Sequence, residues 1–233
     1  MRADQASLGL VADRRPKETD FVVGNIVLAL KPGRSDRVLE IGCGDGKFLE
    51  RIAPRVAGCT AVDLSPVGLA RVRQALRGPA NTTYSAGVSE ALPFQDVTFS
   101  IVVINAVMYA LGSYEEGERT VAEVRRVLQG GGIAYFGEIP TVDEGHGAHS
   151  SGRLLGRTLA KLRRHGLRTT FHLLWERRHE PVHIIAPDTF LYWSRETFTA
   201  LLEKHGFQVA QVFPHETPSG VTSRLNYVAI CPS

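Results

Sequence analysis

A short apolar run that leads into a glycine-rich turn constrains the fold of this chain more than any other feature. Arg37 to Ile41 is rich in β-forming residues and is followed at once by Gly42-Cys43-Gly44-Asp45-Gly46. After the turn, Phe48, Leu49 and Ile52 recur at helical spacing. A strand, a glycine turn and a helix in this order present free N–H groups where a ligand can approach without side-chain obstruction. We therefore expect a nucleotide-like ligand at this turn.

Strand and helix patterns alternate through most of the remaining sequence, which predicts an open α/β sheet covered by helices. Phe99 to Asn105 is almost wholly apolar, as is typical of a strand buried on both faces, and we place it centrally. Pro214 to Leu225 is too short for a helical crossover, so the last two strands are expected to be antiparallel. Further strands are expected over 59–63, 81–85, 133–139, 207–213 and 226–231, with helices over 21–30, 66–76, 114–128 and 195–205.

Length and composition favour one catalytic domain. A chain of 233 residues can bury one substantial core, so we expect a single domain over 1–233. Residues 1–20 are interpreted as a mobile leader or cap, and residues 140–190 as an insertion that forms a lid over the acceptor site. The formal charge of +3 disfavours nucleic acid as a partner.

The cellular setting follows from the cysteines and the apolar runs. The three cysteines do not form a disulfide framework or a paired metal-ligand spacing. The sequence also contains neither a signal-peptide pattern nor an apolar run long enough to span a membrane. We expect a soluble, cytoplasmic protein that can still contact a membrane surface.

The glycine spacing argues against two common nucleotide motifs. A dinucleotide fingerprint has its third glycine at the sixth position, where this chain has Lys47, and NAD and FAD are therefore disfavoured. Lys47 is followed by Phe48 rather than Ser or Thr, and the spacing does not match a Walker loop. An adenosine ligand without a pyrophosphate remains.

The string Val38-Leu39-Glu40-Ile41-Gly42-Cys43-Gly44-Asp45-Gly46 resembles the first motif of class I S-adenosylmethionine-dependent methyltransferases. The resemblance continues with Ala61-Val62-Asp63-Leu64-Ser65, Leu92-Pro93-Phe94 and the segment from Val127 to Gly132, and it covers roughly Arg37 to Glu138. It implies a Rossmann-like, seven-stranded, mostly parallel sheet with helices on both faces and an antiparallel C-terminal strand. It also implies methyl transfer from S-adenosylmethionine to a small-molecule acceptor.

The same resemblance assigns cofactor contacts residue by residue. The glycine turn would line the methionine part, with Glu40 near its ammonium group, and Asp63 would bind the ribose hydroxyls. Leu64 would pack on the adenine face, Val88 and Ser89 would lie at its edge, and the backbone carbonyl of Asn105 would meet the ammonium. The assigned positions are Glu40, Gly42, Cys43, Gly44, Gly46, Asp63, Leu64, Val88, Ser89 and Asn105.

One of these assignments has an independent reason, and two positions depart from the family pattern. An acidic residue about 20 positions beyond the glycine turn is placed at the end of the neighbouring strand, where ribose hydroxyls lie, and this fits Asp63. Val88 and Ser100 stand where members often have Asp. The change at Val88 removes an acceptor for the adenine amino group and keeps a non-catalytic cofactor-binding protein open as the alternative function.

The catalytic base is not identified by any motif. An oxygen acceptor needs its proton removed, and the residues expected near the carboxyl edge of the sheet are Tyr109, Glu138, His146 and His149.

His179 and His183 have a helical metal-ligand spacing, but Pro181 between them makes a regular helix unfavourable, so we predict no metal site.

The insertion contains a predicted basic amphipathic helix. Arg153, Arg157, Lys161 and Arg164 fall on one stripe, with leucines on the opposite side. The stripe is either a solvated face over a packed lid or a surface for an anionic acceptor or an anionic membrane. In the alternative function, the same insertion would be a docking surface for a partner.

Overall fold

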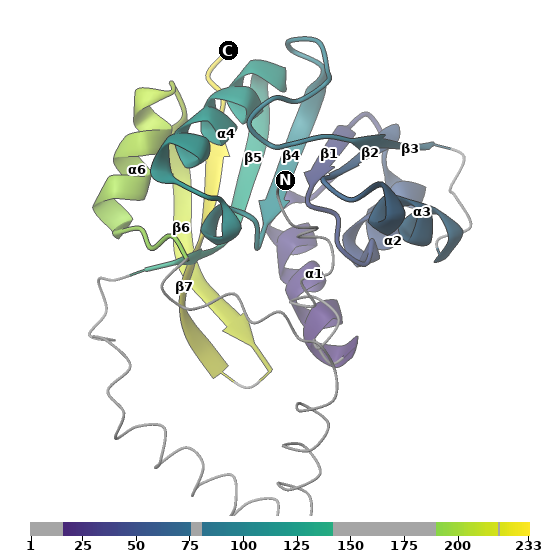
Figure 1. The fold of residues 1–233 in the computed structure, drawn as a ribbon, viewed down its shortest axis with the longest axis horizontal. Coiled ribbons are helices and arrows are strands. Elements are labelled where there is room, and N and C mark those ends of the chain that lie inside the picture. Colours follow the sequence, from purple (N-terminus) through teal and green to yellow (C-terminus); the bar gives the residue numbers. More distant parts are fainter. Residues whose placement is uncertain (1–15, 76–80, 142–189, 219) are drawn as a thin grey trace, which may run out of the picture.

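The computed structural model describes residues 16–75, 81–141, 190–218 and 220–233. They form one seven-stranded sheet with the order β3-β2-β1-β4-β5-β7-β6 (Figure 1). Strands β1 to β5 are parallel, and β7 lies antiparallel between β5 and β6. The predicted fold is thus confirmed, with β4 at the centre. The strands are β1 (Arg37–Ile41), β2 (Gly58–Asp63), β3 (Thr82–Ala86), β4 (Phe99–Asn105), β5 (Leu128–Pro140), β6 (Gln208–Thr217) and β7 (Gly220–Ile230).

Helices cover both faces of the sheet, and each face has its own apolar core. Alternate side chains of a strand point to opposite faces, so in β1 Val38 joins one core and Leu39 the other. The central strand β4 is a nearly continuous apolar run for this reason. The helices are α1 (Pro16–Leu30), α2 (Lys47–Ile52), α3 (Pro66–Ala75), α4 (Tyr114–Val127) and α6 (Arg195–Lys204), with short 3₁₀ turns η2 (Ala53–Arg55) and η3 (Met108–Ala110).

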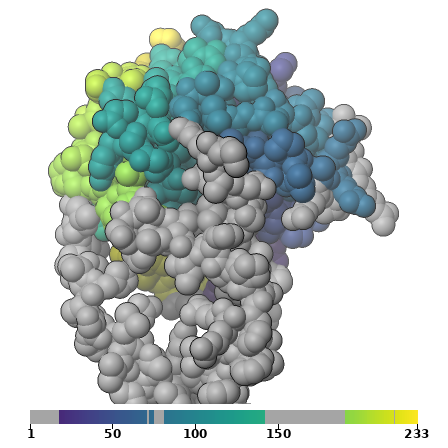
Figure 2. Space-filling view, viewed as in Figure 1, coloured from purple at the N-terminus to yellow at the C-terminus, as the bar shows by residue number. Residues whose placement is uncertain are grey.

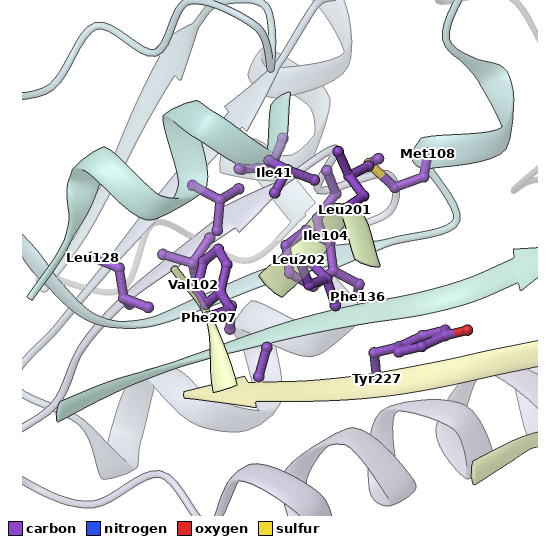
Figure 3. Packing of buried hydrophobic residues seen from close by; sticks show 14 of the residues in the cluster. Ile41, Val102, Ile104, Met108, Leu128, Phe136, Leu201, Leu202, Phe207 and Tyr227 are labelled. Carbon is purple, nitrogen blue, oxygen red and sulfur yellow. The ribbon is translucent and has the colours of Figure 1, made fainter. Parts of the chain in front are cut away.

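One core lies under α4 and α6 and contains several aromatic rings (Figure 3). Phe136 of β5 meets Phe198 of α6 edge to face, with ring centroids 5.7 Å apart. The other core packs α1, α2 and α3 against the opposite face of the sheet. Because α1 also contacts β5 and β6, it flanks the carboxyl edge beside the C-terminal hairpin (Figure 1).

Serine caps set the starts of three helices. Ser194 Oγ accepts the Thr197 N–H, and Thr197 Oγ1 accepts the Ser194 N–H, which completes a capping box. Ser65 Oγ accepts the Gly68 N–H at 3.0 Å, and Ser113 caps α4. Helices α4 and α6 lie side by side (Figure 2), and Lys204 Nζ donates to Glu118 Oε1 between them at 2.6 Å.

Two predicted boundaries are wrong. Helix α1 begins at Pro16 and not at the predicted Phe21. The segment from Pro214 to Leu225 is mostly strand rather than a connection, because β6 and β7 continue as a long hairpin in which Thr217 pairs with Gly220. Pro214 is tolerated there because β6 is an edge strand and the register shifts next to it.

Several features of the sequence lie outside the described residues, including His146, His149, the histidines at 179 and 183 and the basic stripe. Within the described ranges, no group of three or more His, Cys, Asp or Glu side chains is arranged to hold a metal ion. None of the helices in this part of the chain is both long and apolar enough to cross a membrane.

Candidate functional site

The glycine turn lies between the ends of the two strands that flank β1. Ile41, the last residue of β1, pairs with Val62 of β2 and with Ile104 of β4. The Gly42 N–H donates to the Val62 carbonyl at 2.8 Å. Asp63 and Asn105 end β2 and β4 one residue later, so both lie at the level of the turn. The parallel register therefore gathers predicted cofactor residues from three strands at one edge.

The turn needs glycine for its backbone conformation and for space. Gly42, Gly44 and Gly46 all have positive φ angles, of 74°, 53° and 75°. A Cβ on Gly42 would overlap the Val107 side chain, which follows β4. The backbone thus comes closer to the neighbouring loop than any other residue type would allow.

Glu40 gives this turn its charge. Its side chain is buried, and its Oε2 atom has no hydrogen-bond partner among the described residues. Burial raises the pKa of Glu40 well above 4.5, and the neighbouring carboxylates of Asp45 and Asp63 raise it further. A positively charged group placed here would relieve both the desolvation and the repulsion. The site therefore fits a cation such as an ammonium or sulfonium and disfavours a pyrophosphate.

The cysteine of the turn does not supply a nucleophile. Cys43 is buried, and desolvation together with the nearby Glu40 and Asp63 carboxylates raises the pKa of its thiol far above its usual range. A thiol that stays protonated at neutral pH is poorly reactive. Its place in the turn is consistent with lining a ligand and not with attacking one.

Asp63 and Leu64 stand where a nucleoside would meet the sheet edge. Asp63 Oδ1 accepts the Ser65 N–H at 3.0 Å, which fixes the carboxylate at the start of α3. Leu64 is 52% exposed, and it is one of few large apolar side chains that the sheet edge leaves uncovered. An aromatic base packed on Leu64 would bury this apolar surface.

Val88 and Ser89 follow β3 and make local contacts. Val88 pairs with Ala91 in an isolated antiparallel bridge. The Ser89 hydroxyl is buried and lies 2.9 Å from Thr120 Oγ1 of α4. The Ser89 side chain thus joins this loop to α4.

A second cluster crosses the ends of β4, β5 and β7. Glu138 is buried at the β5 bulge and has a positive φ of 59°. Its Oε1 accepts from Asn105 Nδ2 at 3.1 Å, and its Oε2 accepts from Arg224 Nη1 at 2.6 Å. The Glu138 N–H donates to Asn226 Oδ1 at 3.0 Å. Three neighbouring strands are therefore joined through one carboxylate.

Tyr109 completes this cluster from the loop after β4. The Arg224 guanidinium carbon lies 4.8 Å from the centre of the Tyr109 ring, a cation–π contact. Phe190 packs edge to face on the same ring, with centroids 5.1 Å apart. The structure thus brings two of the predicted base candidates, Tyr109 and Glu138, into contact with the same side chain, that of Arg224.

A pocket of about 190 Å³ opens beside Glu138. It lies between α1, the end of β5 and the β6–β7 hairpin, and six of its seven lining residues have polar side chains. Sequence reasoning missed His215 and Arg224, since both fall in the segment interpreted as a connection. Continuing the period-2 pattern of the two strands through this segment would have extended the hairpin and found them. The lining residues are Glu18, Val22, Glu138, His215, Thr217, Thr222 and Arg224.

Comparison with known proteins gives the site its family. A protein family described as a methyltransferase domain matches residues 39–136, which include the glycine turn, Asp63 and Asn105. Residues 39–136 therefore correspond to a methyltransferase domain of the class I, S-adenosylmethionine-dependent kind. The resemblance inferred from the sequence motifs is thereby confirmed, and S-adenosylmethionine is the cofactor of this class.

Two relatives of this chain illustrate the range of the family. Nodulation protein S of Rhizobium tropici is 31% identical over 54% of this chain and 52% of its own length. Malonyl-[acyl-carrier protein] O-methyltransferase of Erwinia pyrifoliae is 36% identical over 46% of this chain and 38% of its own. The chain thus spans about half or less of these relatives.

A solved structure shares the fold over nearly the whole chain. The N-methyltransferase NodS of Bradyrhizobium japonicum WM9, in complex with S-adenosyl-L-homocysteine, superposes with a TM-score of 0.65 at 18% identity. The match covers 96% of this chain and 92% of that one.

Proposed function

We propose that this chain transfers the methyl group of S-adenosylmethionine to a small-molecule acceptor. The observation that carries the proposal is the buried Glu40 carboxylate, whose Oε2 atom has no partner at the foot of the glycine turn. A buried polar atom without a hydrogen bond costs about 1–3 kcal/mol. An aminoacyl sulfonium supplies the positive charge and the N–H donors that this position lacks.

The residues present fit such a cofactor along its whole length. Glu40 and the backbone of Gly42 to Gly46 would hold the methionine part, and the Asn105 carbonyl would meet its ammonium. Asp63 would accept hydrogen bonds from the ribose hydroxyls, and Leu64 would cover one face of the adenine. Val88 and the backbone of Ser89 would lie at the adenine edge. When bound, this cofactor supplies an electrophilic methyl group, so the protein needs no covalent nucleophile.

The chain's own contribution is to align the acceptor and exclude water. The acceptor is methylated on oxygen or nitrogen, and the names of the relatives include both an O-methyltransferase and an N-methyltransferase. The proposed acceptor classes are a secondary metabolite, a sugar and an anionic or lipid-linked metabolite. The free, buried thiols of Cys43, Cys59 and Cys231 support a reducing, cytoplasmic setting for this reaction.

A protein that binds the cofactor without turnover is the alternative function. It is favoured by Val88, which stands where the family often has Asp and which offers no side-chain acceptor to the adenine amino group. In that case the insertion would serve as a docking surface for a partner. Cofactor binding is common to both functions, so only product formation separates them.

Calorimetry and label transfer test the proposal together. We expect heat on titration with S-adenosylmethionine and S-adenosylhomocysteine and none with NAD. Asp63→Ala should weaken binding about 10-fold to 100-fold, the loss of one to two hydrogen bonds to a charged group. Asp96→Ala, which changes an exposed carboxylate paired with Arg126, is the matched control and should bind normally.

The turnover assay uses methyl-labelled S-adenosylmethionine and a metabolite extract. Labelled product and S-adenosylhomocysteine are expected with the unsubstituted protein. Tight cofactor binding without any product would support the non-catalytic alternative, and binding of NAD in place of S-adenosylmethionine would contradict both.

A further inference from the structure

A single hydrogen bond, between Asn105 and Glu138, connects the place proposed for the cofactor to the pocket beside Glu138. Asn105 ends β4 at the level of the glycine turn, and its side-chain amide donates to Glu138, which lines the pocket. Ligands of open α/β sheets bind outside the carboxyl ends of the strands, where the pocket lies. A group held there would lie beside the methionine end of the cofactor, which carries the methyl group.

Glu138 is built into this pocket as a positioning residue. Its backbone is held in a left-handed conformation at a β-bulge, an arrangement that costs free energy and is enriched at functional sites. Each carboxylate oxygen accepts a hydrogen bond, one from Asn105 and one from Arg224. A Cβ on the preceding Gly137 would overlap the Asn105 side chain. The carboxylate is thus committed to orienting Asn105 and Arg224.

The lining of this pocket includes His215, and an imidazole is the commonest general base in enzymes. It is only 4% exposed and comes from β6, and the Thr222 hydroxyl donates to its backbone carbonyl at 3.1 Å across the hairpin. The charged residues that line the same pocket are Glu18 of α1, Glu138 of β5 and Arg224 of β7.

We propose that this pocket binds the methyl acceptor and that His215 is the general base that removes the proton from its nucleophilic group. The inference rests on the proposed function and adds a catalytic residue and an acceptor class to it. The acceptor's oxygen or nitrogen forms a bond to the methyl carbon as the sulfur–carbon bond breaks, with the sulfur keeping the electron pair. The acceptor proton passes to a His215 ring nitrogen and then to water.

The charges of the pocket select the acceptor class. Glu18 and Glu138 bring two negative charges, Arg224 brings one positive charge, and His215 is neutral when it acts as a base. The balance among the described lining residues is one negative charge, and like charges repel strongly where water is partly excluded. Thr217 and Thr222 add hydroxyl groups. The acceptor part held here is therefore an uncharged or cationic group with hydroxyl or amino substituents, and not a carboxylate or phosphate.

The test uses the full chain, methyl-labelled S-adenosylmethionine and a bacterial metabolite extract separated by anion exchange into a retained anionic pool and an unretained pool. Label should enter the unretained pool. His215→Ala should lower the rate at least about 100-fold, the usual contribution of a general base, with unchanged calorimetric affinity for S-adenosylmethionine. Added imidazole should restore part of the rate, which a merely structural role would not allow. His205→Ala, at the end of α6, is the matched control and should keep the full rate.

The outcomes separate this inference from the proposed function. Label transfer that survives in His215→Ala, or label found only in the anionic pool, would overturn the inference and leave the methyltransferase activity standing. Cofactor binding without label transfer by the unsubstituted protein would overturn the proposed function and this pocket assignment with it.

Discussion

At the glycine turn the buried Glu40 carboxylate leaves one oxygen without a partner, whereas at the end of β5 the buried Glu138 carboxylate engages both of its oxygens. The charged groups of the first site lie close together in the sequence, within residues 40–63. The second joins residues as far apart as Glu138 and Arg224. A carboxylate that stays unsatisfied is prepared for a charged ligand, while a satisfied one holds other side chains in place.

The largest effect should come from closing the space at the glycine turn. Gly42→Ala puts a Cβ where the Val107 side chain lies and forces a left-handed conformation on a residue that disfavours it. Affinity for S-adenosylhomocysteine should fall by more than about 100-fold, or about 2.7 kcal/mol. Calorimetry measures this.

The control for Gly42→Ala is Gly206→Ala, which separates backbone strain from lost space. Gly206 has a similar φ of 79°, but the nearest atom to an added Cβ is Arg125 Nε at 3.7 Å. Both variants should lose about 1 kcal/mol of folding free energy from the positive φ. Equal binding losses in the two would argue against a ligand at the turn.

Removal of the Glu138 carboxylate should cause the largest loss of folding stability. Glu138→Ala leaves Arg224 without its ion-pair partner and Asn105 without its acceptor, so the free energy of unfolding should fall by about 3 kcal/mol. Urea denaturation measures the change. Glu50→Ala, at the half-exposed pair with Lys47, is the control and should cost under about 0.5 kcal/mol. Similar losses at both pairs would mean that the Glu138 cluster is not cooperative.

The Glu40 carboxylate should lower the stability of the fold while it strengthens cofactor binding. Glu40→Gln should raise the free energy of unfolding at pH 8 by about 1 kcal/mol by removing a buried charge, and should weaken S-adenosylmethionine binding about 10-fold. The control is Glu203→Gln on the exposed side of α6, which should change neither quantity.

The pH dependence of Glu40 has a definite sign. Because the folded pKa is raised above 4.5, the folded chain holds this proton more tightly than the unfolded chain does. The contribution of Glu40 to stability is therefore fully present below pH 4.5 and is lost as the pH rises through the folded pKa. Glu40→Gln should lack this loss in pH-dependent urea unfolding. If the stability of Glu40→Gln changed with pH in the same way as that of the unsubstituted protein, a group other than Glu40 would cause the pH dependence.

The smallest effect is expected at the adenine edge. Ser89→Ala and Thr120→Val each remove one partner of the same buried hydroxyl pair and should each cost about 1 kcal/mol of stability. Because the Ser89 hydroxyl is committed to Thr120, cofactor affinity should change by less than about 3-fold in either variant. A loss of affinity in Ser89→Ala alone would show that its hydroxyl also binds the adenine.

Local sequence patterns predict most of the helices and strands of this chain. Period-2 and apolar runs place β4 at the predicted residues, and serine caps start α3, α4 and α6. The glycine turn with Glu40 and Asp63 could be identified because a strand, a turn and a following strand lie close together in sequence. The hairpin of β6 and β7 was cut short, since its distal part contains Pro214 and polar residues that are typical of loops.

The sequence by itself determined the alternating α/β pattern, the cofactor turn and its acidic neighbours, because each depends on residues near one another in the chain. Only the tertiary structure decided the partners of Tyr109 and Glu138, the pocket beside them and the place of His215. Those groups meet because β7 inserts between β5 and β6, which brings Arg224 and the hairpin to the end of β5. Sheet order is set by packing of whole elements, and no local run of residues encodes it.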